Sequence, residues 1–270
     1  MSNLKLLVAG AAGKMGRAVI RAALSTPGVT LAGGFERTGS EALDRDLGPL
    51  AGLDALGISV DAGPQQAIRH ADALVDFTAP AASLANARVA AEHGVPLIVG
   101  TTGFSAAEEK EIAALSARIA IVKSGNMSLG VNLLAELVRQ AASRLGPDYD
   151  IEIIEAHHRD KLDAPSGTAL MLARAAAGGR GVDLESHSVR TREGAAVARP
   201  RGAIGFAVVR GGGIIGDHEA MFAGSEETIT LSHHAIDRGL FAKGAIAAAK
   251  WAIAKPPGLY SMADVLGFTR

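Results

Sequence analysis

Short apolar runs alternate with amphipathic stretches through the first half of the chain. Five runs have the length of strands: residues 4–10, 29–35, 73–78, 96–103 and 119–125. The stretches between them carry apolar residues at helical spacing, as at Met15, Val19 and Ala23. Strands that are apolar on both faces need helices on both sides, and right-handed crossovers make such a sheet doubly wound. This half therefore predicts an α/β fold with a Rossmann-type, doubly wound parallel sheet.

The pattern changes after residue 126. A long helix is predicted over residues 129–145, followed by a strand over residues 150–158 and a second helix after Ser166. Four later segments alternate apolar and polar residues between glycine-rich turns: residues 187–191, 203–210, 218–224 and 227–234. We therefore expect a second, α+β domain with a mixed or antiparallel sheet. A last helix is predicted over residues 237–255, before two prolines.

Composition narrows the class of protein. The chain has 270 residues, which is enough for two domains, and 48% of them are hydrophobic. Its net charge of -1 lacks the basic excess of a nucleic-acid-binding protein, and it has no cysteine for disulfides or thiolate chemistry. There is no signal-peptide pattern and no run of about 20 apolar residues that would cross a membrane. We expect a cytoplasmic protein that binds neither nucleic acid nor membrane.

The first apolar run leads into a glycine-rich loop. Gly10, Gly13 and Gly16 form the pattern GxxGxxG between a predicted strand and a predicted helix. Glycines let the backbone approach a pyrophosphate, and a helix amino terminus offers N–H groups to it. At the end of the second run, Glu36 is placed to hold the ribose hydroxyls of NAD, and Arg37 to meet the 2′-phosphate of NADP, although both also fit an ordinary surface pair. The loop predicts a site for NADH or NADPH.

Two further loops follow strands of the same half. They have the sequences GTTG (residues 100–103) and SGNM (residues 124–127). Ligands of open α/β sheets lie outside the carboxyl ends of the strands, so these loops are candidates to line the nicotinamide half of the cofactor. Their spacing alone is also typical of plain strand-to-helix turns.

The stretch EAHHRDKLDAPSGTAL, residues 155–170, concentrates proton donors before a predicted helix start. Ser166 can cap that helix, and Gly167 and Thr168 can present N–H groups and a hydroxyl to a carboxylate. Lys161 offers a positive charge or a proton, and either adjacent histidine can donate a proton near neutral pH. Beside a reduced nicotinamide, such a stretch predicts hydride transfer to an unsaturated carbon of a carboxylated small molecule, with protonation of the neighbouring atom.

Less specific interpretations of the same residues remain open. Adjacent histidines on a loop are often surface residues, and they seldom converge on one metal ion, so we expect no metal site. Asp163 is expected to brace the loop. The remaining histidines in strand patterns are expected to be structural: His187, His218, His233 and His234. Another two-domain nicotinamide dehydrogenase, or a regulator that senses NAD(P) without turnover, would share the glycine loop.

Residues 152–169, EIIEAHHRDKLDAPSGTA, closely resemble the signature of the dihydrodipicolinate reductase family of bacterial lysine biosynthesis. The loops GAAGKMG, ER, GTTG and SGNMSLGVN follow in the family's order, so the resemblance covers essentially the whole chain. It implies a homotetramer of two-domain subunits, joined through the sheets of their second domains. It also implies the reduction of 4-hydroxy-tetrahydrodipicolinate, a small dicarboxylate, to tetrahydrodipicolinate with loss of water, using NADH or NADPH.

The resemblance also implies roles for segments and residues. Residues 1–127, completed by residues 239–270, would bind the dinucleotide, and residues 128–238 would bind substrate and form the oligomer. His157 and Lys161 would be catalytic. Substrate contacts would come from His158, Ser166, Gly167, Thr168 and Thr102. Cofactor contacts would come from Gly10, Ala11, Ala12, Gly13, Lys14, Met15, Gly16, Glu36, Arg37, Gly100, Thr101, Thr102, Ser124, Gly125, Asn126 and Met127.

Overall fold

The chain divides into two compact units. The computed structural model describes residues 3–192, 194 and 198–268. The first unit comprises Met1–Leu129 and Gly239–Arg270, and the second comprises Gly130–Arg238. Within the described residues, no helix combines the length and the apolar character needed to cross a membrane.

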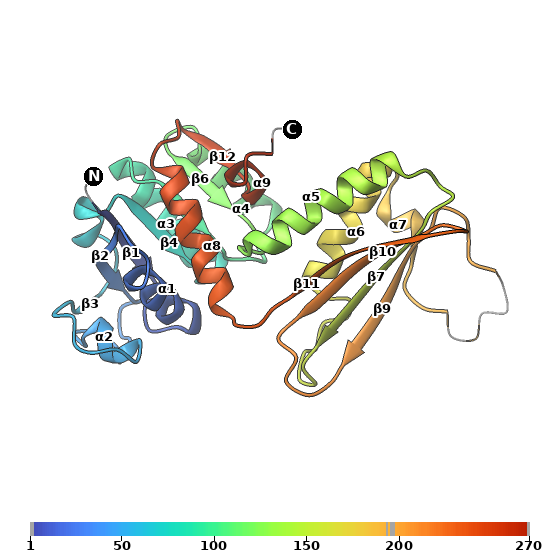
Figure 1. Cartoon of the computed structure of the whole chain (residues 1–270). Coiled ribbons are helices and arrows are strands. Elements are labelled where there is room, and N and C mark those ends of the chain that lie inside the picture. Colours follow the sequence, from blue (N-terminus) through green and yellow to red (C-terminus); the bar gives the residue numbers. More distant parts are fainter. Residues whose placement is uncertain (1–2, 193, 195–197, 269–270) are drawn as a thin grey trace. The chain divides into compact units, whose positions relative to one another are not determined.

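A parallel sheet of seven strands lies at the centre of the first unit (Figure 1). Its strands are β1 (Leu4–Ala9), β2 (Val29–Phe35), β3 (Val60–Asp61), β4 (Ala73–Asp76), β5 (Leu97–Val99), β6 (Ala120–Lys123) and β12 (Gly258–Tyr260). Their order is β12-β6-β5-β4-β1-β2-β3, so the direction of winding reverses between β1 and β4. This confirms the predicted Rossmann-type sheet, and ligands of such sheets lie at this reversal.

Helices cover both faces of this sheet because its strands are apolar on both sides. The helical segments are α1 (Lys14–Leu24), α2 (Leu47–Leu50), the 3₁₀ turn at Ala67–His70, α3 (Pro80–His93), α4 (Ala106–Leu115), α8 (Gly239–Ala252) and α9 (Met262–Val265). In β1, Leu6 and Val8 pack with α1 and α8, whereas Leu7 and Ala9 pack with α3 and α4. Two separate cores result, and α8 returns to complete the first of them.

Several short elements of the first unit carried no periodicity that would predict them. Strand β12 has three residues after a pair of prolines, yet it pairs in parallel with β6. Strand β3 has two residues and helix α2 has four. Elements this short fit no period of 2 or 3.6 residues, so only the pairing with an existing sheet edge defines them.

The second unit is built on a mixed sheet, as predicted. Its strands are β7 (Asp150–His157), β8 (Ser188–Val189), β9 (Ile204–Arg210), β10 (Asp217–Ala223) and β11 (Thr228–His234), in the order β11-β10-β7-β9-β8. Strand β10 pairs antiparallel with β7 and β11, whereas β9 pairs in parallel with β7 and β8. The helices of this part are α5 (Leu129–Arg144), α6 (Gly167–Arg180) and α7 (Leu184–His187).

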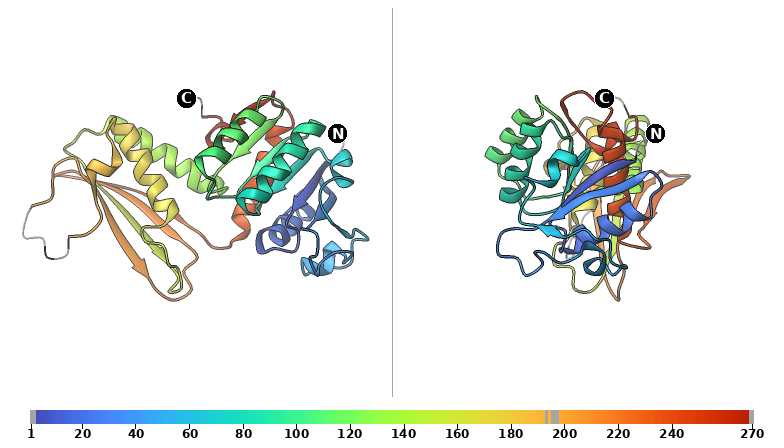
Figure 2. Two further views of the ribbon diagram at one scale, coloured as in Figure 1. Left: turned by 180° about the vertical axis from the view of Figure 1, so that it is seen from behind. Right: turned by 90° about the vertical axis from the view of Figure 1, so that its left-hand side faces the viewer.

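In the described part of the second unit, helices lie on one face of the sheet (Figure 2). Residues of β7 are alternately buried, and Ile151 and Ile153 belong to a core shared with α5 and α6. Figure 2 shows no described helix on the opposite face. The alternation along β7 therefore also sets which side chains face α6, and His157 is one of them because it lies in phase with Ile153. The prediction of a strand from residue 187 was wrong for His187, which ends α7.

Candidate functional site

The glycine loop of the first unit has the backbone geometry of a phosphate-binding turn. Gly10 has φ +62°, and a Cβ on Gly16 would lie 2.1 Å from the carbonyl oxygen of Gly10. Both positions therefore require glycine. Gly13 is the N-cap of α1 and has no side chain that could occupy the first-turn N–H groups. The amino end of α1 is thus built to receive a pyrophosphate, and it fits a dinucleotide.

Glu36 lies beside this loop. Its Oε1 accepts a hydrogen bond of 3.0 Å from the backbone N–H of Ala12. Its own N–H donates to the carbonyl of Asp61 in β3, which fixes the end of β2. Arg37 follows with an exposed side chain. The structure therefore brings the predicted acidic residue and the predicted glycine loop together, with a cation next to them.

The other two predicted cofactor loops meet at the same edge of the sheet. The N–H of Ser124 donates to the carbonyl of Val99, and a Cβ on Gly125 would lie 3.5 Å from Thr102. The hydroxyl of Ser124 bonds to the carbonyl of Asn126, which closes the SGNM turn. Met127 is 1% exposed and packs in the core, so its side chain is structural.

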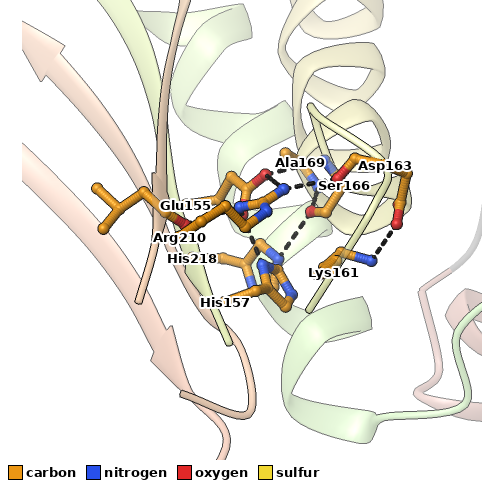
Figure 3. A network of polar contacts seen from close by, with 9 residues as sticks. Glu155, His157, Lys161, Asp163, Ser166, Ala169, Arg210 and His218 are labelled. Atoms are coloured by element: carbon orange, nitrogen blue, oxygen red, sulfur yellow. Dashed lines mark hydrogen bonds and ion pairs between the residues drawn. The ribbon is translucent and has the colours of Figure 1, made fainter. Parts of the chain in front are cut away.

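Glu155 is the centre of a polar network in the second unit (Figure 3). Its carboxylate accepts a hydrogen bond of 2.8 Å from each terminal guanidinium nitrogen of Arg210. It also lies 2.5 Å from Nδ1 of His157 and accepts a hydrogen bond of 3.0 Å from the N–H of Ser166. Burial by itself would raise the pKa of Glu155, but the bonds from Arg210, His157 and Ser166 outweigh it and hold that pKa below its usual value. The ionised carboxylate ties together the ends of β7 and β9 and the start of α6.

The ring of His157 is held on three sides. Nδ1 faces Glu155, and the ring of His218 crosses it edge-on with 5.0 Å between centroids. A Cβ on Gly216 would lie 3.0 Å from Nε2 of His157, so glycine leaves the space that the ring uses. Because Nδ1 is bonded to the carboxylate, Nε2 is the nitrogen that can exchange a proton with a ligand.

Lys161 lies on the turn between β7 and α6, near His157 (Figure 3). Its Nζ pairs with Oδ1 of Asp163 at 2.7 Å, and this ion pair lowers the pKa of Asp163. The N–H of Lys161 bonds to the carbonyl of His158, which closes the turn. Arg210 binds the carbonyl of Asp163, so the prediction that this residue braces the loop agrees with its contacts.

The amino end of α6 completes the group. Ser166 is its N-cap, as predicted, and its Oγ accepts from the N–H of Ala169 at 3.1 Å. Gly167 is exposed, and a Cβ there would meet no heavy atom within 4 Å. Open space thus lies beside the first turn of α6, next to Thr168. Figure 3 shows His157 and Lys161 beside this helix start.

Three residues of this network were not singled out from the sequence. Glu155 opens the conspicuous stretch but looked like an ordinary strand residue. Arg210 lies 55 residues beyond Glu155, so no local pattern joins them. His218 was expected to be structural, yet its Nε2 lies 3.2 Å from Oγ of Ser166 inside the network. Within the described residues, no cluster of three or more histidine and acidic side chains could hold a metal ion.

His218 makes stability depend on pH. Burial, and then the neighbouring His157, lower the pKa of His218 to about 4. The unfolded chain therefore takes up this proton first as the pH falls, and the free energy of unfolding should drop by about 2 kcal/mol between pH 7 and pH 5 through this group. Denaturant unfolding at both pH values should show a smaller drop in His218→Gln than in wild type. An equal decrease in the free energy of unfolding in both proteins would contradict the lowered pKa of His218.

Comparison of the sequence with known proteins gives one consistent family. Residues 4–127 match the family model "Dihydrodipicolinate reductase, N-terminus", and residues 130–266 match "Dihydrodipicolinate reductase, C-terminus". The 4-hydroxy-tetrahydrodipicolinate reductases of Rhodopseudomonas palustris (strain HaA2) and Afipia carboxidovorans are each 54% identical over 267 residues, covering 99% of this chain and 98% of theirs. Dipicolinate-bound dihydrodipicolinate reductase from Paenisporosarcina sp. TG-14 has the same fold, with a TM-score of 0.77, 24% identity, and coverage of 97% and 98% of the two chains.

Proposed function

The chain belongs to the dihydrodipicolinate reductase family, the oxidoreductases that reduce 4-hydroxy-tetrahydrodipicolinate in diaminopimelate and lysine biosynthesis, and we propose that its second unit performs the proton chemistry of this step. Hydride comes from a nicotinamide cofactor, which we assign to the first unit. The Glu155 network carries the proposal for the second unit. A buried, ionised carboxylate that is hydrogen-bonded to an imidazole stabilises the protonated ring and so supports proton transfer by it.

The substrate in this proposal is a small dicarboxylate held at the start of α6. Open space beside Gly167 and the amino end of a 14-residue helix favour a carboxylate there. The cation of Lys161, and the groups of Ser166, Thr168 and His158, would add further contacts to the substrate. Thr102 is proposed as a contact from the GTTG loop. The dipicolinate bound to the Paenisporosarcina enzyme supports a dicarboxylate of this size.

Two groups can supply the proton that must follow hydride addition. His157 offers Nε2, with Glu155 stabilising the charged imidazole. Lys161 offers an ammonium that pairs with the partly exposed Asp163, and a substrate carboxylate can replace this partner. We propose that Lys161 carries the critical proton and that His157 exchanges protons with the substrate and holds it in place. The atoms balance when one hydride and one proton are added and one water leaves.

The cofactor in this proposal is NADH or NADPH. The glycine loop Gly10–Gly16 would hold the pyrophosphate, with backbone contacts from Ala11, Ala12, Lys14 and Met15. Residues 100–102 and 124–127 would line the nicotinamide half. Glu36 would hold the adenosine ribose in NADH, and exposed Arg37 would pair with the 2′-phosphate in NADPH.

A coupled assay tests the proposed function. Aspartate semialdehyde and pyruvate are mixed with the upstream synthase, this protein is added, and loss of nicotinamide absorbance is followed. Rapid oxidation that depends on the synthase is expected. If the protein binds NADH but oxidises none, the fold assignment stands, and a different substrate or a sensor of NAD(P) becomes the better explanation. Pyridine-2,6-dicarboxylate separates a reductase from a sensor. It should raise the melting temperature further in the presence of NADH for a reductase, whereas a sensor should not respond to it.

The same assay measures cofactor choice. Glu36 favours NADH and Arg37 favours NADPH, so the two values of kcat/KM should differ by less than about tenfold, which is roughly 1.4 kcal/mol. Arg37→Ala should shift the ratio toward NADH, because only the phosphate of NADPH loses a partner. A preference of about a hundredfold for either cofactor in wild type would contradict the proposed balance.

We further propose a cytoplasmic homotetramer formed through the helix-free face of the second sheet. Register places Ile154, Ala156 and Val209 on this face, and Val209 is 49% exposed. The same face carries polar residues, since Glu219 lies opposite Ile154 and Asp217 opposite Ala156, so the proposed contact between copies combines apolar and polar groups.

A further inference from the structure

A buried carboxylate at the reversal point of the first sheet has no assigned role. Asp76 ends β4 and is 0% exposed. It lies between Ala9 of β1, which leads into the glycine loop, and Val99 of β5, which leads into the GTTG loop. Among the described residues, no cationic side chain pairs with it. A charge buried in this way is costly unless many donors converge on it, so its neighbours must supply them.

Neutral donors from three segments converge on Asp76. Oδ1 accepts the N–H and hydroxyl of Thr78 at 2.8 and 2.7 Å and the hydroxyl of Ser83 at 2.8 Å. Oδ2 accepts the side-chain amide of Asn86 at 2.8 Å. Thr78 belongs to the turn after β4, whereas Ser83 and Asn86 belong to α3. A carboxylate accepts hydrogen bonds without donating any, which suits a centre surrounded by donors.

The third segment is the GTTG loop. The hydroxyl of Thr101 lies 2.7 Å from that of Ser83 and 3.4 Å from Oδ1 of Asp76, and Thr101 is 5% exposed. The N–H of Gly100 donates to the carbonyl of Asp76. On the other side, a Cβ on Gly10 would lie 2.9 Å from Cγ2 of Thr78. The carboxylate thus fixes the turns that follow β4 and β5, directly beside the glycine loop.

We propose that Asp76 is a positioning residue for the nicotinamide half of the cofactor site. The inference rests on the proposed binding of a nicotinamide dinucleotide by the first unit. Glu36 at the end of β2 marks the adenosine side of the reversal point, so the turns after β4 and β5 lie on the nicotinamide side. Asp76 touches neither the cofactor nor the substrate in this proposal. It acts by holding Thr78 and Thr101.

Binding to two ligands separates this role from general stability. ADP-ribose has the adenosine and both phosphates of NADH but no nicotinamide. Ser83→Ala removes the hydroxyl that joins Thr101 to Asp76, and should weaken NADH binding roughly fivefold, the worth of one neutral hydrogen bond. Asp76→Ala should weaken it about twentyfold. Binding of ADP-ribose should change by less than about twofold in both.

The chain offers a matched control. Ser116 is another buried serine of the first unit, 7% exposed, and its hydroxyl donates to the carbonyl of Ala113 in α4. Ser116→Ala should leave the affinities for NADH and ADP-ribose unchanged within about twofold. Asp76→Asn keeps one acceptor oxygen, and the amide of Asn86 can turn to meet the new donor, so NADH affinity should be partly rescued relative to Asp76→Ala.

Titration of the full chain with NADH, followed by fluorescence, and with ADP-ribose, followed by calorimetry, gives both affinities for wild type and for each variant. A selective loss for NADH in Ser83→Ala and Asp76→Ala supports the inference. Equal losses for both ligands, no loss, or the same loss in Ser116→Ala overturns it. No substrate is present in these titrations, so a failure of the coupled assay would contradict the proposed reaction without affecting this result.

Discussion

Replacing Lys161 by alanine should lower kcat by about a hundredfold or more, because general acid catalysis by a positioned side chain contributes about 10² to 10⁴. The structure makes this substitution a clean test. Lys161 pairs with Asp163, whose side chain is 59% exposed. Such an ion pair contributes at most about 1 kcal/mol to stability. The melting temperature of Lys161→Ala should therefore stay close to that of wild type, and the lost rate can be assigned to the missing ammonium.

Asp163→Asn is the matched control for this prediction. It removes the charge that pairs with Lys161 but keeps the ammonium and the backbone carbonyl that Arg210 binds. Its kcat should remain within about threefold of wild type, as is usual for a partly exposed charge. Single-turnover measurements in the coupled assay give the rate of the chemical step. If Lys161→Ala retains the wild-type rate in that step, His157 becomes the residue that supplies the critical proton.

The fold was predictable because its signals are periodic. Strands apolar on both faces, such as β1, leave few alternatives to a parallel sheet covered by helices. The glycines at positions 10 and 16 were also predictable from the sequence, because the backbone geometry of the loop excludes every other residue there. The short strands β3 and β12 were not predictable, because they are defined by pairing with a sheet edge and are too short to show a sequence period.

The candidate site was predictable only in part. His157, Lys161 and Ser166 lie within ten residues, so one stretch of sequence displays them together. Their partners come from elsewhere in the sheet. Arg210 reaches Glu155 because β9 pairs in parallel with β7 and places it opposite His157. His218 lies opposite Glu155 through the antiparallel pairing of β10 with β7. Register is a property of the folded sheet, and no spacing in the sequence encodes it.

Glu155→Gln should lower kcat by about a hundredfold, because the amide keeps the size of the side chain but loses the charge that stabilises a protonated His157. It should also lower the free energy of unfolding by about 3 kcal/mol, since the guanidinium of Arg210 loses its buried partner. The pKa of Glu155 is held below its usual value. This network therefore stabilises the fold at pH values above about 4.5 and loses that contribution in acid as the carboxylate becomes protonated.

A second substitution separates the two effects of Glu155→Gln. Removing both members of a buried ion pair costs less stability than removing one, because no uncompensated charge is left. The double variant Glu155→Gln/Arg210→Gln should therefore recover part of the lost free energy of unfolding, measured by denaturant titration, while its kcat stays as low as in the single variant. If activity instead returns together with stability, Glu155 serves only to hold the fold. If activity stays low in a stable protein, Glu155 acts on His157, and the short bond between Oε2 and Nδ1 is the contact through which it does so.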